Sequence, residues 1–143
     1  MKPPAVALAD DDAASGMAAM LADLLTSNVH DFRSRRVVAR AARGVVVFTA
    51  ADRQLSVTLL FAKRTIEVRD GVTPGAATVA APWLVMAKVC SGTMSPWRAW
   101  RDGDLKISGK RVSPVAAAAS WALSVPSSFY DEADRRDKKG SAR

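Results

Sequence analysis

Apolar residues recur at helical spacing near the N-terminus of the chain. Five of them stand at positions i, i+3, i+4, i+7 and i+8: Met17, Met20, Leu21, Leu24 and Leu25. This spacing places them on one face of an amphipathic helix. Aspartates at positions 10–12 precede the stripe, where a carboxylate can cap a helix and favours its positive end. The pattern therefore predicts a helix over residues 12–27.

Strand patterns follow the predicted helix. Five segments alternate apolar and polar residues or are rich in β-branched residues: 45–49, 55–61, 65–69, 76–80 and 104–108. The first is apolar on both faces, as expected of a central strand. Turn signals at Asp52-Arg53 and Lys63-Arg64 are short, and short turns join antiparallel neighbours. The sequence thus predicts a meander of strands, joined later by two more.

A short helix that lacks a polar face is predicted after Pro82. Proline suits the first helical position, and Gly92 is placed to end the helix. Between them Lys88 is the only charged residue. A helix that is apolar almost all round has an apolar neighbour on each side. That second neighbour is either another layer of protein or a bound ligand, and the pattern leaves both open.

Two further helices start at serine-proline pairs, Ser95-Pro96 and Ser113-Pro114. The second has a face of small residues and stops before Pro126. In the first, Trp97 and Trp100 share a face and lie beside Arg98 and Arg101. The tryptophans are interpreted as core anchors, ligand walls or contacts with a membrane interface, with the arginines facing water or anionic headgroups. Stacking on nucleic acid is the least favoured reading.

Five arginines follow the first helix, at positions 33, 35, 36, 40 and 43, against one acidic residue, Asp31. A solvated basic loop is the simplest interpretation. Alternatively, Arg36 or Arg40 lies at the mouth of a cavity and binds the carboxylate or phosphate of a headgroup.

Composition and charge narrow the possible classes. The chain has 143 residues, 49% of them apolar, which is enough for one globular domain and argues against disorder of the whole chain. The formal net charge is +7, so anionic partners such as lipid headgroups are plausible. One cysteine forms no intrachain disulfide, and no stretch reads as a signal peptide or a spanning helix. We expect a cytoplasmic protein.

Residues for catalysis or metal binding are scarce. His30 is the only histidine and Cys90 the only cysteine, and the cysteine falls on the apolar helix. Burial there would raise its pKa and keep it unreactive. Paired cysteines for zinc and glycine-rich phosphate loops are absent from the sequence. We therefore expect no catalytic residue, no metal and no cofactor. An enzyme that uses Cys90 or His30 is the alternative.

The order of motifs resembles a known family. An apolar helix, Gly92, Ser95-Pro96 with two tryptophans, Gly103 and the strand to Gly109 resemble the C-terminal half of sterol-carrier-protein (SCP2-like) lipid-binding domains. Upstream, residues 61–71 resemble the family's hairpin that ends in Asp-Gly, although Lys63-Arg64 replaces its usual turn glycine. The resemblance covers residues 17–122. It implies an α+β fold whose helices cover a tunnel for fatty acyl chains, sterols or similar lipids.

These observations combine into one expectation. We expect an α+β domain with a mixed, largely antiparallel, five-stranded sheet covered by helices, at residues 12–125, between a flexible segment 1–11 and a disordered tail 126–143. It would carry a lipid, sterol or fatty-acyl ligand non-covalently, with transient contact to anionic membranes and no nucleic acid. A non-catalytic accessory module with a filled cavity is the alternative. The expected ligand walls are Leu21, Leu24, Leu25, Val57, Leu59, Phe61, Trp83, Met86, Val89, Trp97, Trp100, Leu105 and Ile107, with Arg36 and Arg40 for the headgroup.

Overall fold

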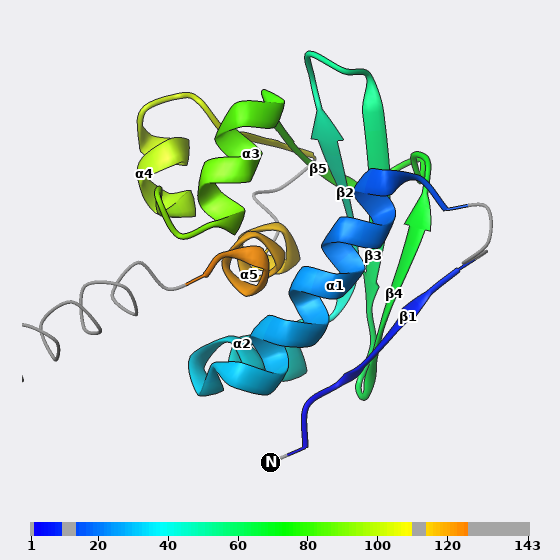
Figure 1. Ribbon diagram of the computed structural model, residues 1–143. Helices are drawn as coiled ribbons and strands as arrows, with labels where there is room; N and C mark the ends of the chain where they lie inside the picture. The colour runs from blue at the N-terminus through cyan, green and yellow to red at the C-terminus, as the bar shows by residue number, and fades with distance from the viewer. Residues whose placement is uncertain (1, 10–13, 110–113, 126–143) are drawn as a thin grey trace, which may run out of the picture.

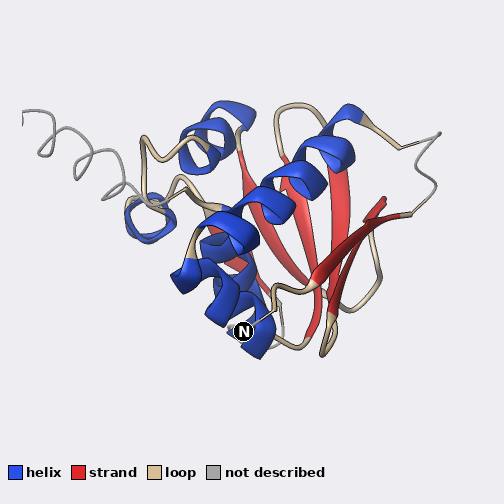
Figure 2. Ribbon diagram, turned by 60° about the horizontal axis from the view of Figure 1, so that its bottom comes forward, coloured by secondary structure: helices blue, strands red, loops and turns tan. Residues whose placement is uncertain are grey.

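Helices pack against one face of a mixed β-sheet (Figures 1 and 2). The computed structural model describes residues 2–9, 14–109 and 114–125, and this part of the chain forms five helices and six strands. The helices are α1 (Gly16–Asp31), α2 (Arg33–Ala41), α3 (Trp83–Cys90), α4 (Pro96–Arg101) and α5 (Pro114–Leu123). The strands are β1 (Ala5–Leu8), β2 (Gly44–Ala50), β3 (Leu55–Phe61), β4 (Thr65–Asp70), β5 (Ala77–Ala81) and β6 (Lys106–Ser108).

The sheet has the strand order β1-β4-β3-β2-β5-β6. The predicted meander β2-β3-β4 is antiparallel, and β5 pairs with β6 in the same sense. The β1–β4 and β2–β5 pairs are parallel, so the sheet is mixed as expected. The α+β class is therefore confirmed.

The expected number of strands was wrong by one. The additional strand, β1, lies in the segment expected to be a loose lead-in. Its backbone is bonded to the outer edge of β4, where Ala5 N–H donates to Arg64 O at 2.9 Å and Ala9 N–H to Val68 O at 2.8 Å. Four residues are too few for a clear period in the sequence, and the strand forms because the edge of β4 offers unpaired backbone groups.

Helix α1 begins later and ends later than the apolar stripe predicts. Ser15 is the N-cap, its hydroxyl accepts from Ala18 N–H at 3.1 Å, and its own N–H donates to the Asp70 carboxylate at 2.6 Å. The aspartates at 10–12 lie outside the described residues. At the other end α1 continues to Asp31, because Asn28 and Val29 are both buried.

Residues 33–41 form a helix, so the expectation of a loop was wrong. The buried residues of α2 are Arg35 and Ala39, one turn apart on the same face. An arginine gives no apolar signal in a pattern search, although arginine has a high helix propensity. The helical period of this segment was therefore hidden by a charged residue that the fold buries.

Helix α4 forms at its predicted start, whereas α3 begins one residue later than predicted, with Pro82 as its N-cap and not its first helical residue. Ser113, the predicted cap of α5, lies outside the described residues. Ser95 caps α4 and accepts from Arg98 N–H at 3.1 Å, and Gly92 has the positive φ of 82° expected after α3. The N-terminus of α3 is capped from a distance, since its Trp83 N–H donates to the Asp52 carboxylate at 2.8 Å. The predicted tail, residues 126–143, lies outside the described residues.

The main core lies between the sheet and helices α1 and α5. Alternate side chains of β2 and β3 face it, and the register pairs them across the two strands: Phe48 with Val57, and Val46 with Leu59. Helix α1 contacts β1, β3 and β4, while α5 contacts β2 and β5. Val57, Leu59 and Phe61 thus point to the helices. This orientation could not be read from the alternation alone.

Candidate functional site

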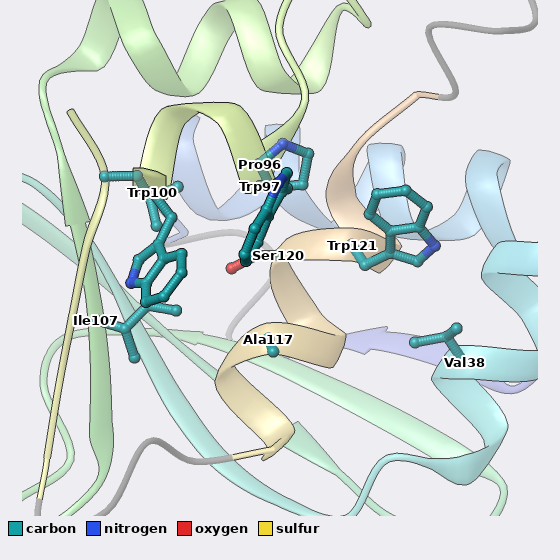
Figure 3. Close-up of a pocket in the computed structure, with 9 residues that line it drawn as sticks. Val38, Pro96, Trp97, Trp100, Ile107, Ala117, Ser120 and Trp121 are labelled. Atoms are coloured by element: carbon teal, nitrogen blue, oxygen red, sulfur yellow. The ribbon is translucent and has the colours of Figure 1, made fainter. Parts of the chain in front are cut away.

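An apolar pocket of about 430 Å³ lies between α4, β6 and α5, with α2 at one side (Figure 3). None of the described residues that line it is charged. The lining consists of one valine, one proline, one leucine, one isoleucine, one alanine, one serine and three tryptophans: Val38, Pro96, Trp97, Trp100, Leu105, Ile107, Ala117, Ser120 and Trp121. Hydrophobic and aromatic side chains with few polar groups are the usual lining of small-molecule sites.

Helix α4 supplies two of the aromatic walls. Pro96 starts the helix after the Ser95 cap, and the spacing i, i+3 then puts Trp97 and Trp100 on one face. Their ring centroids are 5.1 Å apart with an interplanar angle of 36°. Trp97 is 60% exposed and Trp100 42%. Because these rings line the pocket and still reach water, the pocket is open to solvent along α4.

Helix α5 supplies the opposite wall. Three of its residues lie on the helix face that lines the pocket: Ala117, Ser120 and Trp121. Ala117 is exposed, and its methyl group leaves space where a larger side chain would fill the pocket. The hydroxyl of Ser120 donates to Ala116 O at 2.8 Å within the helix. That hydroxyl is therefore already satisfied, and the α5 wall behaves as an apolar surface.

A buried arginine positions Trp121. The guanidinium carbon of Arg35 lies 4.1 Å from the centroid of the Trp121 ring, in cation–π geometry. The same guanidinium donates to Ser124 O and to Ser124 Oγ, both at 3.0 Å, and so binds the C-terminal end of α5. Asn28 donates to Ala122 O at 2.9 Å. Burial lowers the pKa of Arg35, and the negative end of the α5 dipole favours its charge.

Four of the expected wall residues meet in this pocket: Trp97, Trp100, Leu105 and Ile107. A second set lines a separate space of about 20 Å³ under α3: Leu21, Met86 and Val89, again with Leu105. That volume holds about one water molecule. Leu105 and Ser120 border both spaces and so form the partition between them. The apolar flanks of α3 enclose little room for hydrocarbon.

The remaining expected wall residues lie in the core or against it. Leu25, Val57, Leu59 and Phe61 are buried in the main core, and Leu24 and Trp83 pack against it partly exposed. The Trp83 ring also faces Arg53, whose guanidinium carbon is 4.9 Å from the ring centroid. None of these six residues lines the pocket. Their roles as ligand contacts stay predictions.

The two arginines expected at the headgroup donate to backbone carbonyls. Arg36 Nε donates to Val29 O at 2.8 Å, and Arg40 donates to Lys2 O at 2.7 Å. Neither belongs to the residues that line the pocket. Five other residues that line the pocket were not predicted as walls: Val38, Pro96, Ala117, Ser120 and Trp121. Trp121 was the available signal, because it is the single aromatic residue of α5.

The two residues of the enzyme alternative, Cys90 and His30, lie outside the lining of the pocket. Burial raises the pKa of Cys90 to about 11, so its thiol is protonated at neutral pH. His30 is exposed beside Asp31, with 3.0 Å between Nδ1 and a carboxylate oxygen.

Within the described ranges, no three acidic, histidine or cysteine residues are grouped to hold a metal ion. In residues 2–9, 14–109 and 114–125, no helix combines the length and the hydrophobicity that a membrane-spanning segment requires.

Solved structures with this fold include two sterol-carrier-type domains. One, described as "UbiJ-SCP2 Ubiquinone synthesis protein", has a TM-score of 0.53 and 22% sequence identity, over 73% of this chain and 93% of that one. The other, "sterol carrier protein 2", has a TM-score of 0.55 and 15% identity, over 73% and 91%. No family model and no curated protein sequence matches the chain. The chain therefore has the SCP2-like fold.

Proposed function

We propose that this protein binds a lipid, sterol or fatty-acyl ligand non-covalently, with the ligand's hydrocarbon in the pocket between α4, β6 and α5. The observation that carries the proposal is a pocket of about 430 Å³ in an SCP2-like fold. Its described lining has no charged residue and includes three tryptophans. Pockets for small molecules range over about 300–1,000 Å³.

The driving force would be removal of hydrocarbon from water. Each methylene buried contributes about 0.8 kcal/mol, so about ten methylenes would supply about 8 kcal/mol before the entropic costs of association. The described lining has no charged group to balance a buried carboxylate or phosphate. A charged end of the ligand would therefore stay at the mouth of the pocket, in water.

The names of the two similar structures are compatible with such a ligand. One names ubiquinone synthesis and the other a sterol carrier. Ubiquinone and sterols are both mostly hydrocarbon, with a small polar end. For this chain the proposal includes the general class and the reversible carriage of the ligand, without a chemical step.

The pocket can be tested by filling it. Ala117→Phe places a phenyl ring in the pocket from an exposed position of α5. If the ring excludes two methylene groups of the ligand from the pocket, the free energy of binding loses about 1.6 kcal/mol. Binding of a fluorescent fatty acid should therefore weaken about tenfold or more. Ala41→Phe is the matched control, because Ala41 is an exposed helical alanine outside the pocket lining. Equal affinities in the two variants would refute the assignment of the pocket.

Native mass spectrometry of the purified protein tests the ligand class directly. A co-purifying lipid, identified after extraction, would support the proposal. The second candidate is a non-catalytic accessory module whose cavity is filled by its own side chains, and the nearly filled space under α3 favours it. An empty protein, together with no binding of the fluorescent fatty acid and no shift in its melting temperature, would leave that candidate ahead.

A further inference from the structure

The mouth of the pocket collects exposed aromatic side chains. Of the described residues, seven large hydrophobic ones are well exposed, and three of these are the tryptophans of the pocket, with Trp121 38% exposed. Tryptophan has an apolar ring and a polar N–H, so it is favoured where one end is apolar and the other wet. The mouth therefore has the composition of a surface that lies at a boundary between an apolar phase and water.

Basic side chains accompany the tryptophans on α4. The side chains of Arg98 and Arg101 are 66% and 60% exposed. Both approach the same carboxylate, that of Asp102, at N–O distances of 3.9 Å and 3.5 Å. Exposed ion pairs of this kind contribute little, and one carboxylate cannot balance two guanidinium groups. Helix α4 therefore keeps a positive charge next to its aromatic face.

We propose that this surface, formed by Trp97, Arg98, Trp100, Arg101 and Trp121, binds the surface of an anionic lipid bilayer. The tryptophan rings would enter the headgroup region, where Trp is enriched in membrane proteins. The two arginines would contact the anionic headgroups, each contributing about 1 kcal/mol near such a surface. A ligand leaving the bilayer would then meet the open side of the pocket, but the binding of the bilayer does not depend on a ligand.

The size of the surface favours a bilayer over a protein partner. At their exposed fractions, the three tryptophans together offer roughly 200–350 Å². This aromatic area alone is below the roughly 800 Å² that a stable protein–protein interface needs from each partner, so a protein would have to contact much further surface. Binding to a bilayer needs no such area. The tryptophan rings are buried at the boundary between headgroups and acyl chains, and the basic side chains are attracted to anionic headgroups. The net charge of +7 also favours an anionic surface.

Vesicle co-sedimentation of the full chain tests the charge contribution. Vesicles of phosphatidylcholine mixed with phosphatidylglycerol are compared with vesicles of phosphatidylcholine alone. The double variant Arg98→Gln/Arg101→Gln should bind the mixed vesicles roughly thirtyfold more weakly than the unsubstituted protein, at about 1 kcal/mol for each basic residue. The control, Lys63→Gln/Arg64→Gln, removes the same charge from the exposed β3–β4 turn, which is separated from β6 by several strands. It should bind almost as well as the unsubstituted protein.

Trp97→Ser tests the aromatic contribution against Val72→Ser, which changes an exposed apolar residue in the loop after β4. The first should weaken the binding of mixed vesicles and the second should leave it unchanged. Three results would overturn the proposal: equal losses in the two charge variants, equal binding to the two kinds of vesicle, or no vesicle binding at all. A fluorescent fatty acid is titrated into the Arg98/Arg101 variant in parallel. If it still binds, the loss concerns the bilayer and not the pocket.

Discussion

Leu105 separates the open pocket from the small space under α3, and its removal should change both stability and ligand choice. Leu105 is 4% exposed and lines both spaces. Leu105→Ala removes three carbon atoms from this partition. Substitutions of buried leucine by alanine cost about 2–5 kcal/mol, and the cost rises with the volume of the cavity left. We expect about 3 kcal/mol, because the space under α3 adds about 20 Å³ to the volume of the lost side chain.

Urea unfolding measures the loss, and a thermal scan should show a fall in Tm of roughly 10 °C. Leu84→Ala is the matched control, since Leu84 is a leucine of α3 that is 64% exposed. Its substitution should change the free energy of unfolding by less than about 0.5 kcal/mol. A loss for Leu105→Ala as small as that for Leu84→Ala would refute the placement of Leu105 in the partition.

The same variant should favour longer ligands. Joining the two spaces gives an acyl chain a deeper end to occupy. Each methylene that becomes buried there adds about 0.8 kcal/mol, which is about a fourfold gain in affinity. Two fluorescent fatty acids of different chain length, titrated into both proteins, measure the gain. The ratio of their affinities should shift toward the longer chain in Leu105→Ala. An unchanged ratio would show that the two spaces do not join.

Two other properties can be measured. Asp52→Ala removes the carboxylate that accepts from the first N–H of α3, and Asp70→Ala removes the one that accepts from the N–H of Ser15, the N-cap of α1. Each should lower the free energy of unfolding in urea by about 1 kcal/mol, and no change would exclude a stabilising role for these hydrogen bonds. The raised pKa of Cys90, about 11 against a reference value of 9.0, means that the unfolded chain loses this proton first as the pH rises. Stability should therefore fall between pH 9 and 11, and less steeply in Cys90→Ala, as followed by urea unfolding at each pH; equal slopes would contradict the burial of the thiol.

The local pattern was sufficient for the elements with a single apolar period. The stripe from Met17 to Leu25 predicted α1, and alternation predicted the β2-β3-β4 meander, because one buried face imposes its period on the sequence. The Ser95-Pro96 pair predicted the start of α4 and the shared face of its tryptophans. The order of these motifs was enough for the fold, which the solved structures confirm.

The tertiary structure decided the features that depend on distant partners. Helix α2 buries Arg35 because the C-terminal end of α5, 89 residues later, accepts its hydrogen bonds. Strand β1 exists because β4 has an edge to pair with. The pocket takes Val38 from α2, Trp97 from α4 and Trp121 from α5. The apolar period of a helix or strand shows that one of its faces is buried. Whether the neighbour on that face is packed protein or open space depends on which remote side chains arrive there, and here small residues of α5 leave the space beside α4 open.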